Sequence, residues 1–270
     1  SQLEVESLQK FQHSNIIKLI DFVVRKEKNI EVMYLLFPLI ENGSLRNVLN
    51  RRERGLILKP KLREVLTDFT AICDALNVLH TYSPSYVHQD IKPENILIAE
   101  DGTPLLTDFG SVRLANISIH SRTQALKIAD EASQFSTISY RSPELFDPQT
   151  GTNLDSRTDV WAIGCLLFAW WYGYSPFECE FADNGTVKVV ECSHLRVLAR
   201  IPINPSPSYE DQIIQEIVEY ILVSDLQQRP FLTDVIYRVR TIRSGLLSGN
   251  GGGGGNNRGK REIGGYSENV

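Results

Sequence analysis

The sequence predicts an α+β chain with a small strand-bearing N-terminal part and a larger, mainly helical remainder. Two short runs rich in β-branched and apolar residues, 16–24 and 32–37, lie near the N-terminus on either side of a charged turn. Apolar residues then recur at helical spacing over residues 61–82. Residues 155–172 are apolar nearly all round, which is typical of a helix in a protein interior.

Length and composition limit the classes of function. With 270 residues the chain is long enough for one large or two modest domains with a proper core. The net charge of -5, with no basic stripe, argues against nucleic acid as a main partner. No apolar run reaches about 18 residues, so we expect no transmembrane helix. The four cysteines are widely spaced without a C-x-x-C pattern, which favours free thiols in a reducing compartment over a disulfide or a zinc site.

The N-terminal part is expected to contain one helix and two strands. Residues 3–11 place apolar side chains on one face and are interpreted as the end of a helix. The runs 16–24 and 32–37 flank the charged turn 25–29 and are predicted to be strands. Residues 38–44 carry turn chemistry and link this part to the remainder.

The remainder is predicted to be helical apart from one hairpin. Residues 61–82 should form a long, largely buried helix. Residues 96–99 and 104–107 read as two short strands joined by the Asp101-Gly102 turn. Further helices are expected at 155–172, 210–223 and 231–246. Residues 249–270 hold five consecutive glycines and few apolar residues, which predicts a disordered tail.

The strongest chemical signal is the stretch His88-Gln89-Asp90-Ile91-Lys92-Pro93-Glu94-Asn95, followed by Asp108-Phe109-Gly110. Phosphoryl transfer needs a carboxylate to orient the attacking hydroxyl, oxygen ligands to hold magnesium on the ATP phosphates, and a cation to neutralise developing charge. Asp90, Asn95, Asp108 and Lys92 supply that set in the order and spacing of a protein-kinase catalytic loop. Asp-Phe-Gly alone would be a weak signal, but the two motifs in order are specific.

From residue 1 to about 246 the chain resembles a eukaryotic protein kinase. The resemblance implies a bilobal kinase fold with a truncated N-lobe and a mainly helical C-lobe. Its expected parts are an N-lobe remnant at 1–37, a hinge at 38–44, the C-lobe at 45–247 and the tail at 248–270. Neither a glycine-rich loop nor a strand lysine precedes Glu4, and position 1 is a serine, so we expect an incomplete chain of doubtful activity with exposed apolar strands.

The resemblance also assigns roles around the reacting phosphate, with ATP and Mg²⁺ as cofactors. Asp90 would be the catalytic base, and Lys92 would lie against the transferred phosphate, as in serine/threonine kinases. Asn95 and Asp108 would bind the metal, because oxygen donors suit a hard cation. His88 is expected to be a packed structural residue.

Further positions would bind the nucleotide. Glu4 matches the helix carboxylate that pairs with the ATP-holding lysine, although a solvated glutamate is the alternative because Glu6 is close. Phe37 would lie at the back of the adenine pocket. The hinge backbone that binds adenine would be Pro38, Leu39 and Ile40, for which a plain linker is the alternative.

Other motif positions predict structural contacts. Ser142-Pro143-Glu144 resembles the family's A-P-E, and Glu144 should form a buried ion pair with Arg229. Thr137 should contact Asp90, and Asp159 should brace the backbone of the catalytic loop.

Gln89 departs from the family pattern, which has arginine there. A neutral amide cannot pair with phosphate through charge, so we hypothesise that activity does not depend on phosphorylation of the activation loop.

Residues 124–128, 132–134 and 137–146 look like the Numb-associated kinase family, most of all its myristoylated and palmitoylated serine/threonine kinase branch. That likeness implies a cytoplasmic protein with peripheral association with Golgi or trafficking membranes, attached only through a missing acylated N-terminus. The expected partner is a protein substrate with a serine or threonine, with no nucleic acid, and we expect a monomer.

Two other functions are alternatives to a kinase. One is a non-catalytic kinase-fold interaction module, a truncated isoform that binds partners through its helical lobe. The other is a different metal-dependent phosphotransferase of kinase-like topology. The intact set of Asp90, Lys92, Asn95 and Asp108 favours the enzyme, since a binding module does not need those residues.

Overall fold

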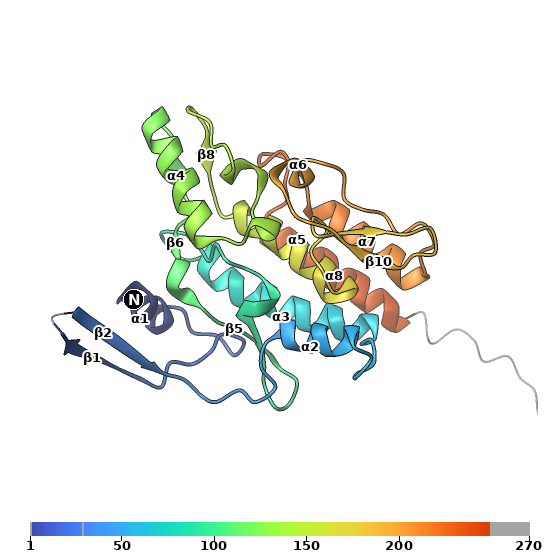
Figure 1. The fold of residues 1–270 in the computed structure, drawn as a ribbon, viewed down its shortest axis with the longest axis horizontal. Helices are drawn as coiled ribbons and strands as arrows, with labels where there is room; N and C mark the ends of the chain where they lie inside the picture. Colours follow the sequence, from blue (N-terminus) through green and yellow to red (C-terminus); the bar gives the residue numbers. More distant parts are fainter. Residues whose placement is uncertain (1, 29, 249–270) are drawn as a thin grey trace, which may run out of the picture.

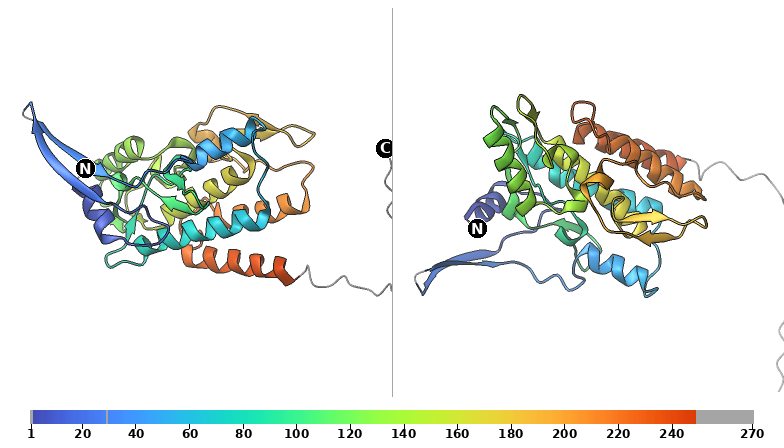
Figure 2. Two further views of the ribbon diagram at one scale, coloured as in Figure 1. Left: turned by 90° about the horizontal axis from the view of Figure 1, so that it is seen from below. Right: turned by 45° about the horizontal axis from the view of Figure 1, so that its top comes forward.

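The N-terminal part is a helix and a hairpin beside a larger helical body (Figure 1). The computed structural model describes residues 2–28 and 30–248. Helix α1 (Gln2–Lys10) confirms the predicted helix, and β1 (Asp21–Glu27) pairs antiparallel with β2 (Ile30–Leu36). The two strands extend away from the body in both views of Figure 2.

The predicted bounds of the first strand were wrong. Residues 16–20 are not part of it, and the charged residues Arg25, Lys26 and Glu27 belong to β1 rather than to a turn. They are tolerated in the strand because all of β1 is exposed, so charged side chains there keep their water. Apolar side chains of the hairpin are exposed as well, as expected from the sequence; they include Phe22, Val24, Ile30, Tyr34 and Leu36.

The body contains most of the helices and the core. Their bounds are α2 (Leu45–Glu53), α3 (Leu62–His80), α4 (Arg122–Phe135), α5 (Arg157–Tyr172), α6 (His194–Val197), α7 (Tyr209–Ile221) and α8 (Leu232–Ser248). Helices α3, α5, α7 and α8 confirm predictions. Helix α5 is buried along its whole length except at Tyr172, with α3 and α7 packed against it and α8 against α3. Within the described residues, no helix has both the length and the apolar character of a membrane span.

Close backbone approach and one ion pair fix the centre of the body. A Cβ added at Gly164 of α5 would lie 2.7 Å from Cδ2 of Leu222, so a larger residue there would push α7 away. The predicted pair of Glu144 and Arg229 is present and bidentate, with N···O distances of 2.8 and 2.9 Å. Arg229 also lies over the ring of Trp161. A buried pair with these extra partners is costly to break from one side only.

Helices α2 and α4 were not predicted. Each begins at a serine whose side chain accepts a hydrogen bond from the third helical residue, Ser44 from the N–H of Asn47 and Ser121 from that of Gln124. Helix α2 buries only Leu45 and Leu49, and α4 only three small or apolar residues. Each helix buries too few apolar residues for helical periodicity to be recognised in the sequence.

Short strands and 3₁₀ turns connect the helices. The pairs are β3 (Tyr86–Val87) with β6 (Arg113–Leu114), β4 (Ile96–Ile98) with β5 (Pro104–Leu106), β7 (Ile117–Ser118) with β8 (Asn153–Leu154), and β9 (Cys179–Phe181) with β10 (Val187–Val189). The turns are η1 (Pro93–Asn95), η2 (Phe109–Ser111), η3 (Ile138–Tyr140) and η4 (Pro143–Leu145).

The hairpin β4–β5 joins the two parts of the molecule. On one side Ile16 bridges Leu106 in parallel, and on the other Ser44 bridges Leu97. The hairpin is therefore held by the chain that follows α1 and by the chain that enters α2, which makes a rigid support for the loops at its ends.

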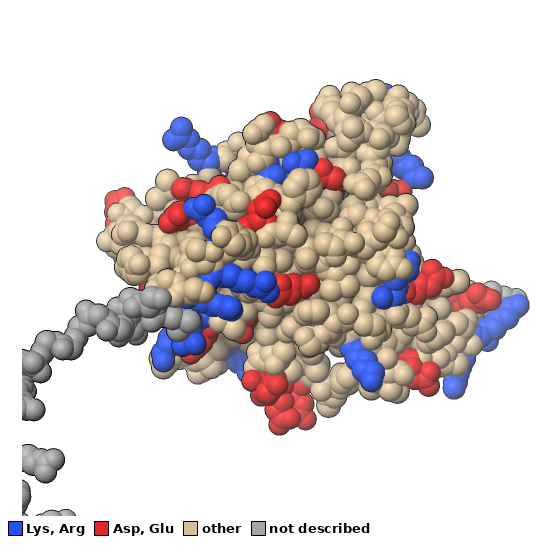
Figure 3. Space-filling model, turned by 180° about the vertical axis from the view of Figure 1, so that it is seen from behind, with Lys and Arg blue, Asp and Glu red and all other residues tan. Residues whose placement is uncertain are grey.

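The back of the molecule carries acidic and basic side chains interspersed (Figure 3).

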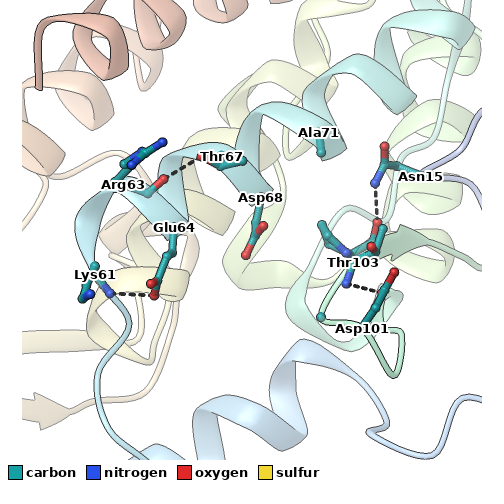
Figure 4. A pocket seen from close by; sticks show the side chains of 11 residues that line it. Asn15, Lys61, Arg63, Glu64, Thr67, Asp68, Ala71, Asp101 and Thr103 are labelled. Carbon is teal, nitrogen blue, oxygen red and sulfur yellow. Dashed lines mark hydrogen bonds between the residues drawn. The ribbon is translucent and has the colours of Figure 1, made fainter. Parts of the chain in front are cut away.

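A cavity of about 770 Å³ lies between α3 and the turn of the β4–β5 hairpin. Asp68 points into the cavity from α3, with Glu64 one turn before it and Asp101 across from it (Figure 4). Burial, together with the charge of Glu64, raises the pKa of Asp68 from 3.8 to about 6.

Replacing Asp68 should stabilise the protein at neutral pH. Because the folded-state pKa is raised, the folded protein binds more protons between about pH 4 and 6, and stability falls as pH rises through that window. The full shift corresponds to about 3 kcal/mol, which screening by water at this partly exposed position reduces to about 1 kcal/mol. Asp68→Asn should raise the melting temperature at pH 7.5 by about 2–4 °C and give no gain at pH 4.

Asp101→Asn is the matched control for this prediction. Asp101 lines the same cavity, but the backbone N–H of Thr103 lowers the pKa of its carboxyl. Its replacement should give no gain at pH 7.5. An equal gain from both variants would contradict the assignment to Asp68.

Candidate active site

The catalytic-loop stretch is anchored to the first turn of α5 through Asp159. The two carboxylate oxygens of Asp159 accept the backbone N–H groups of His88 (2.7 Å) and Gln89 (2.9 Å). The ring of His80 lies 3.0 Å from the same carboxylate. Gln89 has a φ of 71°, a conformation that non-glycine residues rarely adopt, and these bonds hold it there. The predicted bracing role of Asp159 is confirmed.

Asp90 is the centre of a hydrogen-bond network. Its Oδ1 accepts from the backbone N–H and the hydroxyl of Thr137, at 3.2 and 2.9 Å. Its Oδ2 lies 2.7 Å from Nζ of Lys92 and accepts from Nδ2 of Asn95 at 3.0 Å. Lys92 also donates to Thr137 Oγ1 at 2.9 Å. The predicted contact between Thr137 and Asp90 is therefore confirmed, and the carboxylate is fixed from three sides.

Asn95 and Asp108 lie at the same end of the β4–β5 hairpin. The side-chain nitrogen of Asn95 donates to the backbone and side chain of Asp90, which turns its amide oxygen the other way. Asp108 is exposed, with a φ of 62°, and its carboxylate accepts from the N–H of Gly110. The N–H of Thr107 donates to the carbonyl of Asn95, which ties the two loops together.

His88 has a structural place, as expected. It is fully buried, its Nε2 lies 3.0 Å from the carbonyl oxygen of Thr107, and its ring meets Phe109 edge to face at 5.2 Å. Burial lowers the pKa of this histidine, so the ring is neutral at physiological pH.

The residues predicted to bind nucleotide lie on α1 and on the segment after β2. Helix α1 packs against η2, and Oε2 of Glu4 would be 3.9 Å from a Cβ added at Gly110. Phe37 is half-buried against the core, and Leu39 is 85% exposed. The chain following Pro38, Leu39 and Ile40 is fixed to β4, because the carbonyl of Gly43 accepts the N–H of Ile98. The nucleotide-binding roles of these five residues remain predictions.

The side chain of Gln89 lies beside a small void and an ion pair. The side-chain oxygen of Gln89 is buried without a hydrogen-bond partner in the described residues. It lines a small void with Arg113 of β6 and Glu131 of α4, and these two form an ion pair at 2.8 Å. The link between the chain after the Asp-Phe-Gly loop and α4 is thus an internal ion pair, which no sequence motif indicates.

Arg46 at the start of α2 is a second residue that the sequence analysis missed. Its Nε donates to Glu94 of the catalytic loop at 2.8 Å. The two residues are 48 positions apart and carry no motif relation, so only the fold reveals the pair. Among the described residues, no group of three or more His, Cys, Asp or Glu side chains could hold a metal ion without other ligands.

Comparisons with known proteins agree with this geometry. Residues 1–238 match the family model described as the protein kinase domain. Serine/threonine-protein kinase 16 of Rattus norvegicus and that of Homo sapiens are each 32% identical over 244 residues, which cover 90% of this chain and 76% of theirs. A probable serine/threonine-protein kinase of Dictyostelium discoideum is 32% identical over 307 residues, covering 88% of this chain and 81% of its own.

Removing the charge of Asp159 should loosen the catalytic loop. In Asp159→Asn one of the two backbone N–H groups would face an amide NH₂ instead of an acceptor, at a cost of about 3 kcal/mol. Amide hydrogen exchange at His88 and Gln89 should accelerate, and the melting temperature should fall. Asp147→Asn, which removes an exposed partner of Arg122, is the control and should change little. Unchanged exchange at His88 and Gln89 would contradict the anchoring role.

Proposed function

Because this chain belongs to the protein kinase domain family and is a serine/threonine protein kinase, we propose that Asp90 is its catalytic base toward the hydroxyl of a protein serine or threonine. The observation that carries the proposal is the network on the Asp90 carboxylate, formed by Thr137, Lys92 and Asn95. Such a network fixes the direction of the carboxylate before the substrate arrives, and orientation of this kind is a main source of rate in phosphoryl transfer.

Asp90 and Lys92 have complementary roles in this proposal. The Asp90 carboxylate accepts the hydroxyl proton and orients the oxygen toward the γ-phosphate. Lys92, already 2.7 Å from that carboxylate, places its ammonium group where negative charge grows on the transferred phosphate. Thr137 lies in the activation segment, between the Asp108-Phe109-Gly110 and Ser142-Pro143-Glu144 motifs, and because it binds both side chains it couples that segment to the site.

The family implies ATP as the phosphate donor and typically Mg²⁺, and the residues at the hairpin end fit that metal. We propose Asn95 and Asp108 as its protein ligands, because an amide oxygen turned away from Asp90 and an exposed carboxylate are hard donors. Two protein ligands would suffice, because phosphate oxygens and waters can supply the rest. A metal ion held there would supply positive charge to the phosphates. The residues proposed to face the nucleotide are Glu4, Phe37, Pro38, Leu39 and Ile40.

The wider biology follows from the resemblance and remains proposed. We infer a place in the Numb-associated family, in its myristoylated and palmitoylated branch, from the likeness of residues 124–128, 132–134 and 137–146. On that basis the protein would act in the cytoplasm, with peripheral association with Golgi or trafficking membranes. Protein substrates follow from the family itself, whereas a monomeric state and the lack of a nucleic-acid partner are proposals.

Replacing Asp90 tests the central proposal. Asp90→Asn keeps the size of the side chain and one acceptor oxygen but removes the base, and kcat for a serine- or threonine-containing protein should fall by about 10²–10⁴-fold with little change in KM for ATP. Asp130→Asn on the exposed face of α4 is the matched control and should keep full activity. Retained activity in Asp90→Asn would refute the assignment, and lack of activity in the unaltered protein would favour the non-catalytic interaction module.

Phosphatase treatment tests the role of Gln89. Since Gln89 offers no charge to a phosphate and Arg113 is already paired with Glu131, treatment should change activity by less than about two-fold. Mass spectrometry before and after treatment shows whether phosphate was removed. Loss of activity together with loss of phosphate would show that the activation segment depends on phosphorylation after all.

A further inference from the structure

The guanidinium group of Arg46 joins four separate segments of the chain. From the first turn of α2 its Nε donates to Glu94 Oε1 at 2.8 Å, and its Nη1 donates to the carbonyl of Gly173 at 2.7 Å. Its Nη2 donates to the hydroxyl of Tyr140 at 3.4 Å. Only 19% of the side chain is exposed, so the group is held inside this ring of acceptors rather than in water.

These acceptors lie beside the candidate catalytic residues. Glu94 follows Lys92 by two positions, and Tyr140 follows Thr137 by three. Lys92 and Thr137 both bind Asp90. A protein segment whose hydroxyl reaches Asp90 therefore extends its neighbouring residues toward the exposed carboxylate of Glu94, beneath which the hydroxyl of the buried Tyr140 also binds Arg46.

The acceptor set is one that would suit an incoming arginine. A carboxylate, a backbone carbonyl and a hydroxyl are arranged to receive several N–H groups of one planar guanidinium. Glu178 also acts on Arg46 electrostatically, which adds a second negative charge. The guanidinium of Arg46 occupies these three acceptors, and its positive charge neutralises the charge of Glu94.

We propose that Arg46 is a specificity-determining residue that fills, from inside the protein, an acceptor set otherwise available to a substrate arginine. The inference rests on the proposed function of the Asp90 site. An arginine near the acceptor serine or threonine of a substrate would then not raise kcat/KM. That arginine would have to displace Arg46 and leave its guanidinium buried without partners. The substrates it accepts are segments without a required basic residue.

A peptide series tests this inference. Arginine is placed in turn at each of five positions on either side of the acceptor serine, and kcat/KM is compared with that of the norleucine peptide. For the unaltered protein, the ratio should stay within about three-fold at every position. For Arg46→Met, which keeps the stem and removes the guanidinium, arginine should raise kcat/KM by about ten-fold or more at one position at least, since a hydrogen bond to a charged group is stronger than one between neutral groups.

Two further variants separate Arg46 from general damage. Arg46→Lys keeps a cation against Glu94 and should show little of the new preference. The double variant Arg46→Met/Glu94→Gln removes the carboxylate and should lose the preference again. A strong arginine preference in the unaltered protein, or none in Arg46→Met, would overturn the inference.

Direct binding keeps the inference independent of catalysis. Calorimetric titration of the arginine and norleucine peptides should show about ten-fold tighter binding of the arginine peptide by Arg46→Met and no difference for the unaltered protein. If Arg46→Met fails to fold, Arg46→Gln, which keeps a donor for the Gly173 carbonyl, replaces it. No phosphotransfer by any variant, with the binding difference intact, would sink the proposed function alone. Equal binding of both peptides by the variant would sink the inference alone.

Discussion

The carboxylate of Asp159 holds the catalytic loop in a backbone conformation that it would not otherwise keep. Two successive N–H groups, those of His88 and Gln89, point at its two oxygens, and Gln89 takes a left-handed φ to allow this. Conformations of this kind cost of order 1–3 kcal/mol and persist only where the surroundings impose them. Asp159 is 1% exposed and belongs to α5, the most deeply packed helix. The backbone that leads into Asp90 is therefore fixed by the core of the body, and the side chains of Thr137, Lys92 and Asn95 then orient the Asp90 carboxylate.

The remaining parts of the site are attached to that loop from two sides. The β4–β5 hairpin places Asn95 and Asp108, and it is held by the chain after α1 and by the chain before α2. The activation segment is attached through Thr137 to Asp90 and through Tyr140 to Arg46. Each element of the site is thus tied to at least one segment far away in sequence. A movement of the activation segment would therefore change the hydrogen bonds on the Asp90 carboxylate without any movement of the core.

Local signals in the sequence predicted the candidate catalytic residues better than they predicted the helices and strands that support them. The order of Asp90, Lys92, Asn95 and Asp108 was readable because their spacing is set by the reaction, and α3 and α5 were readable because they bury a wide apolar face. Helices α2 and α4 bury few residues and depend on their serine caps, so periodicity missed them. The charged end of β1 was missed because an exposed strand has no buried face to impose alternation. The pairs of Arg46 with Glu94 and of Arg113 with Glu131 arise only when the chain is folded.

The central helix α5 also determines the intrinsic tryptophan fluorescence of the protein. All three tryptophans of the chain, Trp161, Trp170 and Trp171, lie on α5. Trp161 stacks on Phe177 below the guanidinium of Arg229, and Trp171 donates to Asp211 while the ammonium of Lys59 lies 3.6 Å from its ring centre. Intrinsic emission therefore reports on the packing of one helix and its neighbours. The β1–β2 hairpin holds no indole, so a molecule whose hairpin had come apart would still emit like the native protein.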